Sequence, residues 1–365
     1  MAPSLQQSSV RGRGASENPA NRFEPLHVAW DSEEEGEFAD APQTEYLIDH
    51  SRTALAKNDS PDVPFDFSLN PYRGCEHGCI YCYARPMHEY LGLSAGLDFE
   101  TKIFVKPDAP ALLRRALSSP KWKPQVIAMS GATDCYQPVE RQLGITRRCL
   151  EVMHEFRNPC GIVTKRDLVT RDIDILGEMA RQGLVHVYVS VTTLKPELSR
   201  IMEPRASGPA KRLEAIRKLA AAGVPVGVMV APVIPALNDE EIPAILKAVG
   251  EAGARSARFI MVRLPHGVAP LFEGWLARHF PDRREKVLHR IREMRGGNLN
   301  DPRFKSRMRG EGIHAEQIRS LFEMCARRVG LESELPPVRS DLFRRPEEGQ
   351  RHGRNVQLSM FNDQR

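Results

Sequence analysis

The chain has 365 residues, a formal net charge of +5 and 41% hydrophobic side chains, which is enough apolar surface for a full core. None of its apolar stretches approaches the roughly 20 residues that span a bilayer, and the first residues lack the apolar centre of a secretory signal. We therefore expect a soluble, cytoplasmic protein with no membrane contact. We expect no structural disulfides, because three of the seven cysteines crowd into residues 75–82 as metal ligands do.

Both ends of the chain have the composition of disordered tails. Residues 1–44 are rich in Ser, Gly, Pro, Glu and Asp, and residues 1–62 carry five Lys or Arg against twelve Asp or Glu. Such a segment cannot offset its ordering entropy by burying apolar surface. Residues 336–365 are rich in Pro, Gly and charge, and they predict a second flexible tail.

Between the tails, residues 45–270 alternate short β-type runs with helical patterns. Apolar runs predict buried strands at residues 65–69, 126–129, 161–164, 185–191, 224–230 and 258–262. The connecting segments place apolar residues at helical spacing, as at Ile173, Leu176 and Met179. This order predicts an α/β fold with parallel strands. Six repeats are too few for a complete eight-stranded barrel, so an open doubly wound sheet and a partial barrel both fit the pattern.

A basic helical extension follows at residues 271–335. Helical patterns cover residues 283–295 and 315–329, and residues 278–328 carry fourteen Lys or Arg against seven acids. Such enrichment can bind phosphate groups, whereas the alternative is a set of solvated helix faces. Charge alone favours the solvated faces.

Chemically active residue types fall where the predicted strands end. Cys75 follows the first strand, Asp134 the second, Lys165 the third, and Thr192 the fourth. Parallel α/β folds place their active sites at the carboxyl ends of the strands. We therefore expect these residues to lie at the same end of the sheet.

Cys75, Cys79 and Cys82 have the spacing C-x3-C-x2-C. Three thiolates hold a cubane iron–sulfur cluster and leave one iron free for another ligand. The alternative is a structural zinc site with His77 or His88 as fourth ligand. Such sites usually bring a second ligand pair, whereas the remaining cysteines are scattered singly, at Cys135, Cys149, Cys160 and Cys325. The spacing therefore favours a cluster.

This loop, with an aromatic residue at Tyr81, resembles that of the radical S-adenosylmethionine (SAM) superfamily. The resemblance implies a partial (β/α)6 barrel of the TIM type, in which Cys75, Cys79 and Cys82 bind a [4Fe-4S] cluster. It implies that the open iron binds SAM, that Tyr81 lies against the adenine, and that an electron donor such as flavodoxin or ferredoxin reduces the cluster. Reductive cleavage of SAM would then give a 5'-deoxyadenosyl radical.

The chain is more closely similar to the spore photoproduct lyase-like branch over residues 65–264. The similarity rests on the segments SGATD (130–134), VTK (163–165), VSV (189–191), EP (203–204), AAAGVP (220–225) and VAPVIP (230–235). By analogy Asp134 and Lys165 contact SAM, Lys165 through the SAM carboxylate, and Ser190 faces the ribose. The alternatives are a helix cap for Asp134, a surface base for Lys165 and an ordinary strand residue for Ser190.

One position departs from the lyase pattern. In that branch a cysteine a few residues before the aspartate supplies a hydrogen atom to the product radical, whereas Gly131 and Ala132 occupy the nearby positions here. Cys135 follows Asp134 directly and is the candidate replacement donor. Its alternative role is packing, because single buried cysteines are usually inert.

The final residues contain Gln357, Leu358, Met360 and Phe361 in the order QLSMF. This resembles the peptide with which bacterial repair proteins bind the sliding clamp, and its alternative is a tail that folds back on the barrel. Clamp binding would imply DNA as a partner.

Together these features predict a radical SAM enzyme, with a lyase reaction in DNA photoproduct or lesion repair as the leading function. The alternatives are a radical SAM enzyme that acts on RNA or protein, and a non-catalytic metal-binding module that recruits partners through its tail.

Overall fold

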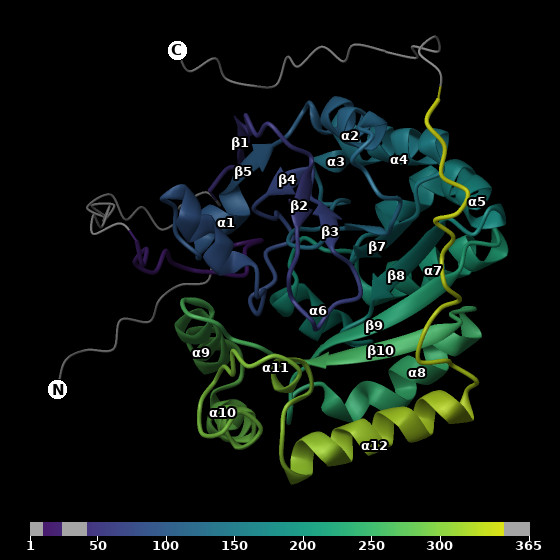
Figure 1. The fold of residues 1–365 in the computed structure, drawn as a ribbon. Helices are drawn as coiled ribbons and strands as arrows, with labels where there is room; N and C mark the ends of the chain where they lie inside the picture. The colour runs from purple at the N-terminus through teal and green to yellow at the C-terminus, as the bar shows by residue number, and fades with distance from the viewer. Residues whose placement is uncertain (1–9, 24–41, 347–365) are drawn as a thin grey trace.

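The computed structural model describes residues 10–23 and 42–346, whose central feature is a twisted seven-stranded sheet (Figure 1). The order across the sheet is β10-β9-β8-β7-β6-β3-β2, and every neighbouring pair is parallel except β2 and β3. The strands are β2 (Leu55–Lys57), β3 (Phe67–Leu69), β6 (Ile127–Met129), β7 (Cys160–Thr164), β8 (Val185–Ser190), β9 (Val226–Val233) and β10 (Ser256–Met261).

The six parallel strands confirm the strands that the sequence predicted. Their inward residues, such as Ile162 in β7 and Val187 in β8, are completely buried. Parallel strands are covered on both faces, so their sequences are nearly continuous in apolar residues. This is why the strands could be recognised from composition, although β9 continues to Val233, three residues beyond the predicted end.

Helices connect successive strands and pack against the sheet. The contacts of α5 with β8, of α7 with β8 and β9, and of α8 with β9 place these helices over one face of the sheet. Apolar side chains on one side of each helix, such as Leu176 and Leu219, are buried against it. The connecting helices are α2 (Ala109–Ser118), α3 (Glu140–Leu143), α4 (Ile145–Phe156), α5 (Ile173–Arg181), α6 (Pro196–Met202), α7 (Pro209–Ala221) and α8 (Ile242–Glu251).

A second, three-stranded sheet has the order β1-β5-β4. It consists of β1 (Glu45–Ile48), β4 (Tyr72–Arg73) and β5 (Lys102–Val105). The cysteine loop lies between β4 and the short 3-10 helix η1 (Arg85–Leu91), and α1 (Leu97–Thr101) leads back into β5. The sequence analysis did not predict this sheet, because two to four residues are too few for a pattern of alternating burial.

The basic extension contains four helices: α9 (Val268–His279), α10 (Arg284–Glu293), α11 (Ser306–Arg309) and α12 (Ile313–Arg328). Two of them, α10 and α12, correspond to the predicted helices, and α12 packs on α8. An ion pair joins Arg307 in α11 to Asp62, which lies in the connection between β2 and β3. The same helix, α11, also contacts the edge strand β10.

Parts of both predicted tails pack against the protein. In residues 10–23, which we call the N-terminal segment, Ala15 is 1% exposed and contributes to a hydrophobic cluster. In residues 336–346, the ring of Phe343 lies 6.2 Å from that of Phe156. The backbone N–H of Arg339 donates to the carbonyl of Gly183 over 2.8 Å. The composition of the two tails did not indicate that these residues pack on the protein, because the residues that they contact are distant in sequence.

None of the helices in the described ranges is long and apolar enough to cross a membrane.

Candidate functional site

The three cysteines lie close together in a buried loop. Cys75 and Cys79 are each 7% exposed, and Cys82 is partly buried. Gly78 has a φ of +65°, and a Cβ atom there would lie 2.5 Å from a carboxylate oxygen of Glu100. Glycine is therefore required at this position, because it alone combines a left-handed backbone with such a close approach.

Burial raises the pKa of all three thiols, and neighbouring charge adds to this rise at Cys75 but opposes it at Cys82, where Arg85 and Lys165 are close. At Cys75 the pKa is raised first by burial, then by Asp134 and by the other two cysteines. Backbone N–H groups oppose this rise: that of Asp134 donates to Cys75, and those of Ala84 and Arg85 donate to Cys82. Such donors stabilise thiolates, which are the forms that bind metal. The loop can therefore hold these cysteines as thiolates when a bound cation balances their negative charge.

The three cysteines fit a cofactor that binds each thiolate at a different metal atom. Within residues 10–23 and 42–346, no three His, Cys, Asp or Glu side chains are arranged around one point as the ligands of a single metal ion. A cubane cluster joins its cysteines to different irons, so its ligands need not converge on one point. Three adjacent thiols with backbone donors match the requirement of such a cluster.

The two histidines considered as a fourth zinc ligand have other contacts. The Nδ1 atom of His77 lies 3.4 Å from Asp134, and the Nε2 atom is buried without a hydrogen-bond partner among the described residues. Burial lowers the pKa of His77 to about 4, so its ring is neutral at pH 7. His88 bonds through Nε2 to the carbonyl of Lys102 over 3.0 Å, and its ring lies 5.5 Å from that of Phe99.

Asp134 holds the end of β7 to the loop that follows β6. Its carboxylate accepts hydrogen bonds from the Thr164 hydroxyl over 2.8 Å and the Lys165 backbone N–H over 2.7 Å. It also accepts one from the Tyr136 backbone N–H over 2.9 Å. These bonds give Asp134 a local structural role, and its contact with SAM stays a prediction.

Lys165 and Tyr81, both predicted SAM contacts, meet at the buried carboxylate of Glu203. The Lys165 ammonium lies 3.7 Å from Glu203 and 5.8 Å from the centre of the Tyr81 ring. The Tyr81 hydroxyl donates to the same carboxylate. Lys165 is 16% exposed at its side chain, whereas Glu203 is completely buried. The structure therefore brings these two predicted residues together around a third.

Arg212 neutralises Glu203 from the other side. Its guanidinium forms an ion pair with the carboxylate and donates to the backbone carbonyls of Ser190 over 3.0 Å and Ser207 over 2.6 Å. Burial alone would raise the pKa of Glu203, but the charges of Arg212 and Lys165 outweigh it and lower this pKa to about 2. Glu203 is thus ionised and fixed throughout the physiological range.

Ser190 is the last residue of β8 and is 4% exposed. Its carbonyl is held by Arg212, as described above. The predicted contact of Ser190 with a ribose stays a prediction.

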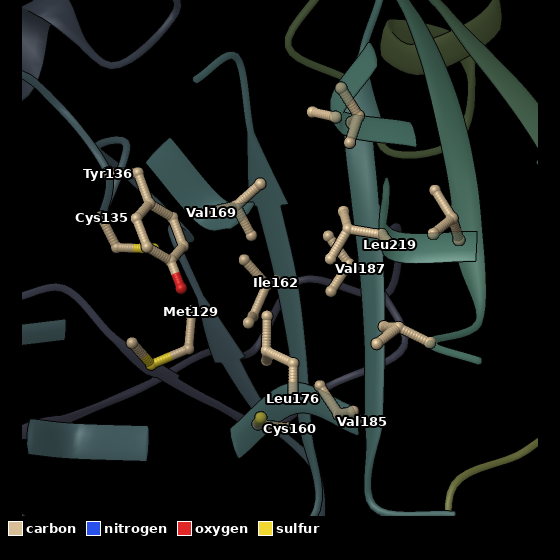
Figure 2. Close-up of a cluster of buried hydrophobic side chains, with 14 of the residues drawn as sticks. Met129, Cys135, Tyr136, Cys160, Ile162, Val169, Leu176, Val185, Val187 and Leu219 are labelled. Carbon is tan, nitrogen blue, oxygen red and sulfur yellow. The ribbon is translucent and has the colours of Figure 1, made fainter. Parts of the chain in front are cut away.

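Cys135 lies in the hydrophobic core. Figure 2 shows it near Tyr136 and Met129, in the same buried cluster as Ile162, and its exposed fraction is zero. Burial raises the pKa of its thiol well above the ordinary value, with further contributions from acidic neighbours such as Asp134. This position is compatible with the packing role that was the alternative for Cys135, and its role as a hydrogen donor stays a prediction.

The predicted clamp-binding residues Gln357, Leu358, Met360 and Phe361 lie outside the described residues. In the basic extension, several arginines have partners within the protein. Arg303 pairs with Asp301 and Glu311, and Arg295 is 3% exposed and donates to the carbonyl of Val262 over 2.7 Å. These arginines serve contacts within the protein, and phosphate binding by the extension stays a prediction beside its alternative of solvated helix faces.

Sequence reasoning missed two buried ion pairs that contact the cysteine loop. One is Arg212 with Glu203, and the other is Arg85 with Glu100. Arg85 also donates to the carbonyl of Cys79 over 3.0 Å. The only available signal was the segment at residues 203–204, which carried part of the family resemblance without indicating a role.

Comparison with known proteins identifies the family. The sequence model of the radical SAM superfamily matches residues 69–249. An uncharacterized protein of Mycobacterium tuberculosis (strain ATCC 25618 / H37Rv) is 35% identical over 276 residues, which cover 74% of this chain and 80% of that protein. An uncharacterized protein of Acidianus two-tailed virus is 31% identical over 218 residues, or 57% of this chain and 71% of that protein.

Solved structures of spore photoproduct lyase share the fold. The lyase complexed with dinucleoside spore photoproduct has a TM-score of 0.57 at 16% identity, and the match covers 78% of this chain and 80% of the lyase. A mutant of the lyase with bound AdoMet and dinucleoside spore photoproduct gives the same TM-score and coverage. At this identity the similarity concerns the fold alone.

Proposed function

Because the chain belongs to the radical SAM superfamily, we propose that Cys75, Cys79 and Cys82 hold a [4Fe-4S] cluster and that the protein cleaves SAM. When bound, the cluster and SAM together supply one-electron cleavage of the SAM C5'–S bond to a 5'-deoxyadenosyl radical. The observation that carries the proposal is the set of three adjacent thiols, two buried and one partly buried, with backbone N–H groups donating to Cys75 and Cys82. The seven free cysteines accord with the reducing cytoplasm, where we place the protein.

The protein's own residues would bind and orient SAM beside the loop. Lys165 is the proposed partner of the SAM carboxylate, since its ammonium is partly exposed and meets Glu203 only at 3.7 Å. Tyr81 offers an aromatic surface for the adenine, and its hydroxyl is fixed by Glu203. We assign Asp134 and Ser190 to the same site by analogy with the family. A site closed by buried ion pairs would exclude water from the radical.

We further propose that the main sheet curves into the partial (β/α)6 barrel typical of the family. Support comes from the contact between Asp62 and Arg307, which links the connection beside edge strand β2 to α11 beside edge strand β10. A sheet whose edges approach each other encloses the carboxyl ends of its strands, where Thr164 and Ser190 lie.

Damaged DNA is the substrate class that we propose, with a lyase-type repair reaction. The support is the sequence similarity to the spore photoproduct lyase-like branch and the clamp-type peptide at Gln357 to Phe361. DNA lesion chemistry requires the damaged bases to leave the stack. Capture of the bacterial sliding clamp by the full chain, but not by a Phe361→Ala variant, would support this substrate class. Equal capture by both would remove the peptide from the argument.

The test of the central proposal is anaerobic measurement of iron and sulfide, with EPR spectra recorded with and without SAM. The wild type should contain about four irons per chain and give a reduced-cluster signal that SAM perturbs. Both should be lost in a triple variant with Cys75→Ala, Cys79→Ala and Cys82→Ala. Stoichiometric zinc without iron, or a cluster signal indifferent to SAM, would instead establish a structural metal module.

A further inference from the structure

Two adjoining cavities near the cysteine loop have walls rich in basic side chains. The first has a volume of about 490 Å³, and Arg11, Arg13 and Arg205 line it together with Thr44 and Tyr46. No acidic residue lines this cavity among the described residues. The carboxylate of Glu76 balances Arg205, so Arg11 and Arg13 supply the remaining positive charge that can attract negative charge from outside the chain.

The second cavity has a volume of about 280 Å³ and lies at the start of α7. Arg141, Arg166 and Lys211 line it, and Asp167 is the one acidic residue among its described lining residues. The two cavities share part of a wall: Arg205 of the first and Ala206 of the second are consecutive residues, and the Arg166 guanidinium donates to the carbonyl of Arg205 over 2.6 Å. We call the two cavities together the basic groove; its described walls contain six basic residues and one acid.

The basic groove is bonded directly to the cysteine loop. The Arg205 guanidinium lies 3.0 Å from the carboxylate of Glu76, and the Arg205 backbone N–H donates to the carbonyl of His77 over 3.2 Å. Glu76 is the residue after Cys75, and His77 is two residues before Cys79. The wall of the groove is therefore within two residues of two proposed cluster ligands.

Part of the groove's positive charge is available to a partner. Arg13 and Arg205 are held by bonds to the protein, whereas Arg11, Arg141 and Lys211 are exposed. Within the residues that the structure describes, none of these three exposed side chains has an ion pair or a hydrogen bond. Exposed basic side chains without internal partners attract an acidic surface and accelerate its association.

Two features favour an acidic protein over a single-stranded nucleic acid as the occupant. Tyr46 is the only aromatic residue in the described walls, whereas proteins that hold single strands present successive aromatic rings for stacking. The groove contacts the loop through Glu76 and His77. Its wall touches Lys165 at the backbone, where the Ser207 N–H donates to the Lys165 carbonyl over 3.2 Å, whereas the Lys165 ammonium lies at Glu203 and Tyr81. A reductant must come close to the cluster because electron transfer slows steeply with distance, and it must leave the SAM site free.

We propose that the basic groove is the docking surface for a small acidic electron-transfer protein such as a ferredoxin. This inference rests on the proposed function, since only a redox cluster requires a reductant. In the complex one electron passes from the reduced ferredoxin to the oxidised cluster. The ferredoxin is oxidised by one electron, the cluster is reduced by one electron, and no covalent bond forms or breaks in this transfer.

The test compares two variants of the cluster-loaded full chain with equal changes of charge. The groove variant carries Arg11→Glu, Arg141→Glu and Lys211→Glu. The control variant carries Lys286→Glu, Arg327→Glu and Arg328→Glu, at exposed positions of the helical extension. Affinity for an oxidised acidic ferredoxin is measured by calorimetry at low and moderate salt, and reduction by the reduced ferredoxin is followed by stopped-flow absorbance.

The groove variant should bind ferredoxin at least tenfold more weakly and should be reduced correspondingly more slowly. The control variant should remain within about twofold of the wild type, and salt should weaken wild-type binding. Equal affinities in all three proteins, or equal losses in both variants, would overturn the proposal. If the groove variant lost affinity for an oligonucleotide but kept its affinity for ferredoxin, the groove would instead be a nucleic-acid surface.

Reduction by dithionite separates this proposal from the proposed function. Dithionite needs no protein docking surface, so the wild type and both variants should cleave SAM equally with it. If the dithionite-reduced wild type fails to cleave SAM, the proposed function fails whatever the ferredoxin affinity. If dithionite supports SAM cleavage but ferredoxin binds and reduces the wild type and both variants equally, the docking proposal is wrong and the proposed function stands.

Discussion

Two buried arginine–glutamate pairs contact the cysteine loop, and their surroundings differ. Arg85 with Glu100 and Arg212 with Glu203 have side chains that are at most 2% exposed. Glu100 also accepts hydrogen bonds from two backbone N–H groups of the N-terminal segment, over 3.0 and 2.8 Å. Glu203 instead accepts hydrogen bonds from the side chains of Tyr81 and Thr192, and the partly exposed ammonium of Lys165 lies 3.7 Å from it.

The difference assigns distinct tasks to the same kind of ion pair. Backbone donors are fixed by the chain, so Glu100 attaches the N-terminal segment to the loop beside Gly78. The Lys165 side chain can rotate away from Glu203 and pair with another anion. Arg212 still neutralises Glu203 when Lys165 has moved. Glu100 thus stabilises the loop, and Glu203 keeps a cation ready at the proposed SAM site.

The largest effect should follow from removal of Arg212. The Arg212→Met variant leaves the carboxylate of Glu203 buried with only Lys165 to balance it, and breaking such a pair costs about 3–5 kcal/mol. The free energy of unfolding, measured by denaturant titration, should fall by this amount. The same should hold for Arg85→Met, because Glu100 is equally buried.

Paired substitutions sharpen the comparison. Arg212→Met combined with Glu203→Leu removes both charges and should restore much of the lost stability, since apolar replacements of buried pairs are often neutral. Arg85→Met combined with Glu100→Leu should recover less, because the N–H groups of the N-terminal segment lose their acceptors. Equal recovery in both double variants would show that the two pairs do not differ.

The next-largest effect should be the loss of stability in acid that follows from protonation of Glu203. Its pKa is lowered from 4.5 to about 2 in the folded protein, against the effect of burial, by Arg212 and Lys165. A carboxyl with a depressed folded pKa contributes stability above its unfolded pKa and loses it as the pH falls through the folded pKa. The contribution of about 3 kcal/mol should therefore disappear between about pH 5 and pH 2.

Denaturant titrations across this pH range would measure the loss. A Glu203→Gln variant should be less stable at pH 7 but should show a flatter decline with acid. Parallel curves for the wild type and this variant would mean that Glu203 is not held ionised by its two cations.

A smaller effect should follow from displacement of the N-terminal segment alone. A Cβ atom on Gly14 would lie 1.8 Å from the backbone oxygen of Gly78, so Gly14→Ala should push the segment away from the loop. Loss of two buried hydrogen bonds costs roughly 1–3 kcal/mol. Trypsin cleavage after Arg13 should therefore accelerate about tenfold or more, as followed by mass spectrometry.

A matched variant controls for the substitution itself. Gly161→Ala adds a Cβ that meets nothing within 4 Å, and it should leave the cleavage rate unchanged. If Gly14→Ala also left the rate unchanged, Glu100 would not attach the segment as inferred.

The sequence predicted the elements that depend on local patterns. Val-rich runs such as the one containing Val187 identified the parallel strands, and the cysteine spacing identified the loop. The two ion pairs escaped notice because a loop separates the partners in each, which are only 15 and 9 residues apart. The attachment of the N-terminal segment and the bond from Tyr81 to Glu203 escaped notice because their partners are far apart in sequence. Gly14 is 86 residues from Glu100, and Tyr81 is 122 residues from Glu203. No periodicity or composition reports contacts of that kind.

Asp134 illustrates the same limit within the site. Its place after a strand predicted a position near the loop, and the structure confirms that position through the N–H bond to Cys75. Its carboxylate bonds to Thr164 and Lys165 depend on the register between β6 and β7, which sequence spacing does not specify. Position could be predicted here, whereas the role of the side chain could not.

The smallest change in stability should come from Lys165→Met, and this variant separates the two tasks most directly. Arg212 still neutralises Glu203 in this variant, and the 3.7 Å contact of Lys165 is long for an ion pair, so stability should fall by about 1 kcal/mol or less. Affinity for SAM should fall about tenfold or more if Lys165 binds its carboxylate. Calorimetric titration with SAM and denaturant titration on the same preparation would measure both. A large loss of stability with unchanged SAM affinity would make Lys165 a structural partner of Glu203, and the two ion pairs would then have the same task.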